Sequence, residues 1–98
     1  MSFHFRPQAL VDLQNILEHI AAENPRAALG MHDNILATCT ILSENPYIAA
    51  ELKGMTLAGI RRFPITNYPR YSIFYQTTDN HVEIIRVGFG GRDWEHII

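Results

Sequence analysis

Hydrophobic residues recur at the spacing of two amphipathic helices in the first half of the chain. From Gln8 to about Ala22 they return at steps of three and four positions, which gathers them on one face of a helix. The apolar positions of this helix are Leu10, Leu13, Ile16, Leu17 and Ile20. A second helix is predicted to follow, with an apolar face that runs through Ala28, Met31, Ile35, Cys39 and Leu42.

The two predicted helices are separated by Asn24-Pro25. Asn is a favoured N-cap and Pro is tolerated at the first helical position, so this pair ends one helix and starts the next. A link this short cannot carry the chain far. The helices are therefore expected to pack antiparallel as a helical hairpin, and Asn45-Pro46 is expected to end the second one.

Short extended segments flank the helices. Weak alternation from Ser2 to Arg6 predicts a strand that Pro7 ends. After a connector from Pro46 to Gly59, runs rich in β-branched and aromatic residues predict three further strands, at positions 60–65, 71–76 and 82–89. Pro64 lacks the N–H that an interior ladder position needs, so the first of these strands is expected at a sheet edge or at a bulge.

This order of elements predicts the fold class. It is α+β, arranged β-α-α-β-β-β, with an antiparallel sheet and the N-terminal helical hairpin packed on one face. A chain of 98 residues has room for a single domain, spanning 1–98, and for no second core.

The last predicted strand is apolar on both faces. With strict alternation, Val82 and Ile84 point to one face, whereas Ile85, Val87 and Phe89 point to the other. A sheet that carries helices on one side only normally shows polar residues on the other side. We therefore expect the second face to need a cover, for which a segment of a partner protein is a candidate.

Composition and charge disfavour several classes of protein. No apolar run approaches the ~18 residues of a membrane-spanning helix, and the N-terminus lacks the layout of a secretion signal, which predicts a cytoplasmic protein with no membrane partner. The single cysteine, Cys39, cannot form an internal disulfide and agrees with a reducing compartment. Eight Lys and Arg against ten Asp and Glu give a net charge of −2, which does not favour direct binding to nucleic acid.

Candidate chemistry is sparse. The five His residues are not spaced like zinc ligands, so neither a metal site nor a cofactor is predicted. Cys39 lies on an apolar helix face and is expected to be a buried thiol rather than a nucleophile. Arginines gather in the predicted sheet half, at Arg61, Arg62, Arg70, Arg86 and Arg92. Such a set suits phosphate or a carboxylate-rich peptide, and solvated strand residues in weak salt bridges are the alternative interpretation.

Four segments, taken in this order and spacing, resemble ParE toxins of the ParE/RelE superfamily over nearly the whole chain. They are the helix break "ENPRAA", the strand opening "GIRRFP", the strand "YSIFY" and the close "RVGFGGRD". The resemblance implies the toxin of a type II toxin–antitoxin system. It also implies a ParD-like antitoxin that neutralises the toxin in a hetero-oligomer, DNA gyrase as the target, and no catalytic residue.

The resemblance, the helical hairpin and the uncovered sheet face, which together form the kind of groove into which a partner helix can fold, suggest two sets of site residues. Antitoxin contacts are expected at Leu13, Leu17, Ile20, Arg61, Tyr71, Ile73 and Tyr75. Toxicity is expected to depend on the final strand and tail, at Arg86, Phe89, Arg92, Asp93 and Trp94.

Two other functions remain open from the sequence. The first is a RelE-like ribosome-dependent mRNA endonuclease on the same fold, with Arg61, Arg70 and Arg92 as the cations around the phosphate. Such an enzyme also needs a general acid and a general base, and His96 is the one candidate proton carrier in the tail. The second is a binding module without toxicity, suggested by Phe89, which stands where family members often have His.

Overall fold

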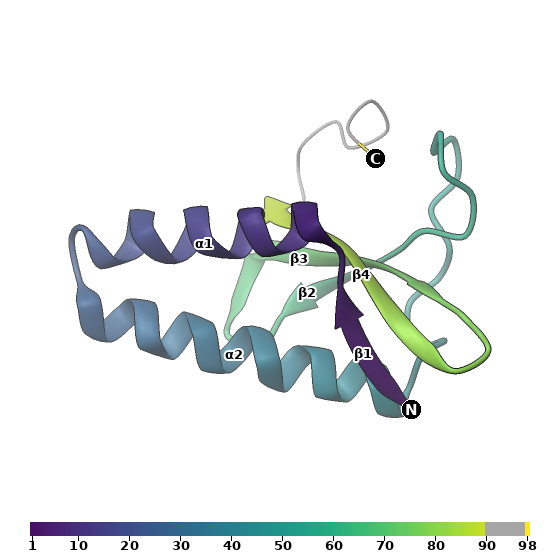
Figure 1. The fold of residues 1–98 in the computed structure, drawn as a ribbon, viewed down its shortest axis with the longest axis horizontal. Coiled ribbons are helices and arrows are strands. Elements are labelled where there is room, and N and C mark those ends of the chain that lie inside the picture. The colour runs from purple at the N-terminus through teal and green to yellow at the C-terminus, as the bar shows by residue number, and fades with distance from the viewer. Residues whose placement is uncertain (90–97) are drawn as a thin grey trace.

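Two helices lie side by side across one face of a four-stranded sheet (Figure 1). The computed structural model describes residues 1–89 and residue 98. The helices are α1, Pro7–Ala21, and α2, Pro25–Glu44. The strands are β1, Ser2–Phe5, β2, Arg61–Ile65, β3, Tyr68–Thr77, and β4, His81–Phe89. The predicted α+β fold and its order of elements are confirmed.

The helical hairpin forms because each helix has a defined start and an apolar face. Pro7 and Pro25 occupy the first helical turn, where a missing N–H costs nothing. Asn24 caps α2 as predicted, since its side chain accepts a hydrogen bond from the backbone N–H of Ala27 at 3.1 Å. The predicted inner face of α2 is buried throughout. On α1, however, Ala9 is the fully buried position, and Leu10 turns outward with 51% of its surface exposed.

The sheet is mixed, with the strand order β1-β4-β3-β2. The meander of β2, β3 and β4 is antiparallel as predicted, but β1 joins the free side of β4 in parallel. Parallel neighbours need a long connection between them, and here the two helices, the connector, β2 and β3 lie between β1 and β4. Pro64 lies on the edge strand β2, next to a shift of register at Ile65. Both alternatives predicted for this strand therefore hold.

A bulge in β4 changes which side chains face the helices. Phe74 pairs with Arg86 and Tyr75 pairs with Ile84, so that Ile85 has no opposite residue on β3. An extra residue of this kind reverses the alternation beyond it. Val87 therefore joins the core beneath the helices, and Ile85 lies on the opposite face. The expectation that Ile85, Val87 and Phe89 share one face is wrong for this reason.

The second face of the sheet is covered by the chain's own connector. Ile60, Phe74 and Ile85 form a small buried cluster there, against which Leu52, Met55, Leu57 and Ile98 pack. Hydrogen bonds hold the connector in place, including one from Leu52 N to Ile60 O at 2.7 Å and one from Tyr75 Oη to Pro46 O at 3.1 Å. The cover predicted for this face is thus provided by the chain itself, and not by the partner segment that was the candidate.

Neither helix in the part of the chain that the structure describes is long and apolar enough to span a membrane.

Candidate functional site

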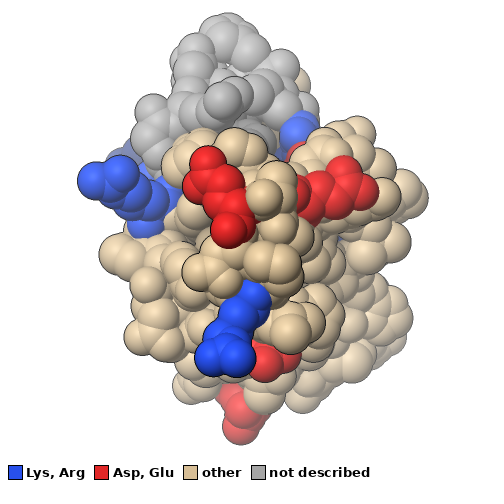
Figure 2. Space-filling view, turned by 90° about the vertical axis from the view of Figure 1, so that its left-hand side faces the viewer, with Lys and Arg blue, Asp and Glu red and all other residues tan. Residues whose placement is uncertain are grey.

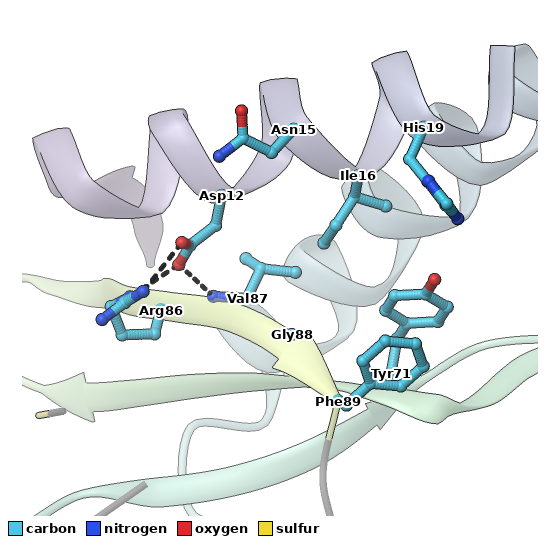
Figure 3. A pocket seen from close by; sticks show the side chains of 9 residues that line it. All are labelled: Asp12, Asn15, Ile16, His19, Tyr71, Arg86, Val87, Gly88 and Phe89. Carbon is cyan, nitrogen blue, oxygen red and sulfur yellow. Dashed lines mark hydrogen bonds and ion pairs between the residues drawn. The ribbon is translucent and has the colours of Figure 1, made fainter. Parts of the chain in front are cut away.

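A groove lies between α1 and the end of β4 (Figure 3). We call it the β4 groove, and its volume is about 380 Å³. One wall is a single face of α1, and the other is the last part of β4 with the neighbouring ring of Tyr71. The lining residues are Asp12, Asn15, Ile16, His19, Tyr71, Arg86, Val87, Gly88 and Phe89.

The groove exists because β1 is shorter than β4. β1 ends at Phe5, opposite Ile84, since Pro7 already begins α1. β4 continues to Phe89, so its outer side beyond Ile84 faces a helix instead of a strand. An N–H on such a side needs an acceptor when it is buried. Asp12 provides one, because its Oδ2 accepts a hydrogen bond from Val87 N at 3.1 Å.

Asp12 also forms a bidentate ion pair with Arg86, which we call the fork. The guanidinium donates from Nε to Oδ2 at 2.7 Å and from Nη2 to Oδ1 at 2.9 Å. Little solvent reaches the pair, since the side chains of Arg86 and Asp12 are 17% and 10% exposed. Arg–carboxylate forks of this geometry are among the stronger and more directional contacts in proteins. The Arg86 charge is therefore compensated inside the wall of the groove.

The opposite end of the β4 groove is aromatic. Tyr71 and Phe89 face each other across β3 and β4, and their rings stack with centroids 4.5 Å apart. Phe89 is 45% exposed. The exposed side chains of Asn15 and His19 lie on the α1 side of the same groove. Such a surface suits an apolar or aromatic side chain of a partner, with polar groups at the rim to fix its orientation.

A second groove runs along the outside of the helical hairpin. We call it the hairpin groove; its volume is about 340 Å³. Its lining is largely apolar, and comprises Leu17, Glu18, Ala21, Ala28, Leu29 and His32. Leu29 is 69% exposed. Figure 2 faces the end of the molecule at which α1 joins α2, and shows charges of both signs scattered among neutral side chains.

The structure divides the predicted antitoxin residues between surface and core. Leu13, Leu17 and Ile20 are half-buried and pack against the main core, and Leu17 also lines the hairpin groove. Tyr71 lines the β4 groove. α1 therefore separates two grooves, one on each side.

Ile73 and Tyr75 are not surface residues. Both are 0% exposed beneath the helical hairpin, so neither offers a surface to another chain, and we remove them from the antitoxin set. Burial raises the pKa of the Tyr75 phenol, against the smaller opposing effects of a backbone hydrogen bond with Ala49 and the charge of Arg61. Arg61 binds the connector, through the carbonyl of Ala49 and through the ring of Tyr47 at 5.1 Å.

Two members of the predicted toxicity set meet in the β4 groove. Arg86 and Phe89 both line it, together with Tyr71 from the antitoxin set. Arg92, Asp93 and Trp94 lie outside the described residues. The sequence interpretation overlooked Asp12. Its position in the sequence could have indicated it, because Asp12 stands three residues after buried Ala9 and four before Ile16. An acidic residue with this spacing lies on the inner side of an amphipathic helix.

Neither metal nor thiol chemistry is indicated among the described residues. Residues 1–89 and 98 contain no group of three His, Cys, Asp or Glu side chains that could hold a metal ion. Cys39 is buried, and its burial raises the pKa of the thiol to about 12. A thiol in such surroundings is not a nucleophile at neutral pH.

Comparisons with known proteins match the chain to one family and one fold. The family sequence profile described as "ParE toxin of type II toxin-antitoxin system, parDE" matches residues 3–94. A solved structure described as "Chromosomal ParDE TA system from P. aeruginosa" superposes with a TM-score of 0.70 at 20% sequence identity. The match covers 91% of this chain and 95% of that one. No curated protein matches the chain significantly.

Proposed function

Because the chain belongs to the ParE toxin family of type II toxin–antitoxin systems, we propose that it acts in the cytoplasm as an inhibitor of DNA gyrase and that a ParD-like antitoxin neutralises it. The family match over residues 3–94 is the observation that carries this proposal. The two grooves beside α1 are the surfaces to which we assign the two partners.

The hairpin groove is our candidate for the antitoxin. An amphipathic helix docks by laying its apolar face into an apolar groove, and the lining from Leu17 to Leu29 offers such a surface. Ala21 and Ala28 are small, which lets a partner helix approach the hairpin closely. We therefore propose that an antitoxin segment folds there and extends across α1 towards Tyr71.

The β4 groove is our candidate for the target. It joins Arg86 and Phe89, and the chain runs directly from Phe89 to the predicted toxicity residues in the tail. The stacked pair Tyr71 and Phe89 presents an exposed aromatic ring, the kind of residue that often anchors protein interfaces. An antitoxin that reached Tyr71 would also cover Phe89, and would neutralise the toxin by occupying the place of the target.

The groove chemistry gives less support to an endonuclease. Cleavage of RNA requires an acid, a base and cations around the phosphate. In the described lining of the β4 groove Arg86 is bound by Asp12, and His19 is the one imidazole. The predicted cation Arg61 lies on β2, where it holds the connector.

The test is induction of the chain alone in bacteria with pulse labelling of DNA and protein synthesis. We expect DNA synthesis to fall first, and the purified chain to inhibit supercoiling by gyrase. Phe89→Ala should abolish both effects, whereas the control Ile48→Ala, which removes an apolar side chain 50% exposed on the connector, should abolish neither. Early loss of translation with cut mRNA would instead establish the endonuclease, and undisturbed growth would leave a binding module.

A further inference from the structure

The end of β4 depends on α1 for its position. We propose that Asp12 is a positioning residue for toxicity, which holds Arg86 and Val87 so that Phe89 meets the target. The toxicity part of this inference rests on the proposed function. The positioning part rests on the geometry of the described residues alone.

Asp12 uses both carboxylate oxygens on the end of β4. Oδ1 accepts from Arg86 Nη2 at 2.9 Å, and Oδ2 accepts from Arg86 Nε at 2.7 Å and from Val87 N at 3.1 Å. One side chain of α1 thereby binds both a side chain and the main chain of β4. Because the three contacts share one planar group, they fix the orientation of the strand as well as its distance from the helix.

The strand needs such a support at this point. β1 accompanies β4 only from His81 to Ile84. The bulge at Ile85 follows at once, and bulges are places where a strand bends and its twist increases. Beyond the bulge, β3 holds one side of β4 as far as the pair of Tyr71 and Phe89. Asp12 holds the side that β1 has left.

Phe89 lies two residues beyond Val87 and on the same face of the strand. A displacement of Val87 would therefore move the Phe89 ring relative to Tyr71 and α1. A charged pair with little exposure is a weak source of stability, since apolar residues of similar size often replace it without loss. What apolar residues cannot reproduce is the fork and the hydrogen bond to Val87 N. The pair is thus better explained by the geometry it imposes than by the stability it adds.

The variants for the test separate geometry from stability. Asp12→Asn keeps an acceptor for Val87 N but loses the charge, and Asp12→Ala loses both. The double variant Asp12→Leu with Arg86→Met restores packing without the fork. As a matched control, Thr38→Ala breaks a partly buried hydrogen bond from Thr66 N, 3.0 Å long, which joins α2 to the turn between β2 and β3. The control should lower the melting temperature without touching β4.

Three quantities are measured on each variant: growth inhibition on induction, melting temperature, and the NMR chemical shifts of the stacked rings of Tyr71 and Phe89. We expect Asp12→Ala and the double variant to lose growth inhibition and to shift the ring signals of Tyr71 and Phe89, with a smaller change in Asp12→Asn. We expect the double variant to melt above Asp12→Ala, because no uncompensated Arg86 charge remains, and below the unmodified chain, because Val87 N has lost its acceptor. Thr38→Ala should keep both growth inhibition and the ring signals of Tyr71 and Phe89.

The proposal is overturned if the double variant inhibits growth like the unmodified chain, or if Thr38→Ala loses growth inhibition to the same extent at a similar melting temperature. If the unmodified chain itself does not slow growth, the proposed function has failed. In that case shifted ring signals of Tyr71 and Phe89 in Asp12→Ala support the positioning by Asp12, and unchanged signals overturn it.

Discussion

The two halves of β4 are held in different ways. From His81 to Ile84 the strand lies between β1 and β3, with main-chain ladders on both sides. From Arg86 to Phe89 it keeps the ladder to β3, while α1 side chains flank the other side. A main-chain ladder forms with almost any side chain, whereas a contact such as that of Asp12 requires a particular one. The groove, and with it the candidate site, occurs in the half that depends on particular side chains.

The largest loss of stability is expected for a substitution in the first half of β4. Ile84 is 0% exposed in the main core, so Ile84→Ala should lower the free energy of unfolding by about 4 kcal/mol, through lost burial and the cavity left behind. Urea denaturation measures this loss. Val11→Ala, at a position 47% exposed on α1, is the control and should change stability little. If Ile84→Ala lowered the free energy of unfolding only slightly, the first half of β4 would not depend on its packing in the main core.

The next largest loss of stability is expected for a substitution in the second half of β4. Arg86→Gln leaves the Asp12 carboxylate poorly exposed and without its cation, which should lower the free energy of unfolding by about 3 kcal/mol. Adding Asp12→Asn should recover part of this loss, because the uncompensated charge is then removed. A double-mutant cycle in urea measures the coupling between the two residues. Strict additivity would mean that the fork contributes nothing to the fold.

Alkaline pH should weaken the core shared by both halves. The Cys39 thiol has a pKa of about 12 in the folded chain against 9.0 as a reference value. A raised pKa means that the folded state keeps its proton while the unfolded state loses it, so stability falls as pH rises from about 9 towards 12. The expected loss is about 1.4 kcal/mol per pH unit in this window. The raised pKa of Tyr75 acts in the same direction.

Urea denaturation at pH 8 and pH 10 measures this alkaline loss. Cys39→Ala is the control, because it removes the thiol and should flatten much of the dependence. A dependence that persisted unchanged in Cys39→Ala would assign the effect to other groups.

The smallest effect is expected for side-chain contacts in the first half. Glu83 contacts His81 Nε2 at 2.6 Å and Arg6 Nε at 3.6 Å, near the surface. Glu83→Gln should cost only about 0.5 kcal/mol, and less at high salt, because the ladders on both sides still hold the strand. Growth inhibition should be unchanged. If Glu83→Gln reduced toxicity as much as Asp12→Ala, the contrast between the two halves would be lost.

The candidate site could be predicted from the sequence only in part. Phe89 and Arg86 were found because they stand in the closing motif, and Tyr71 because it belongs to an aromatic strand. Ile73 looked equally suitable, but alternation does not reveal which face of a strand the helices cover. Asp12 was missed because its partners lie 74 and 75 residues away. No pattern within a few residues indicates a contact between residues so far apart in the sequence.

The sequence by itself determined the elements and their order. Helix periodicity, the cap at Asn24 and the prolines at helix starts are effects within a few residues, and they operate whatever the rest of the chain does. Only the tertiary structure decided the parallel place of β1, the bulge at Ile85 and the fork between Asp12 and Arg86. These features depend on how strands of unequal length share one sheet, since β1 leaves part of β4 to be held by a helix. The groove follows from that mismatch.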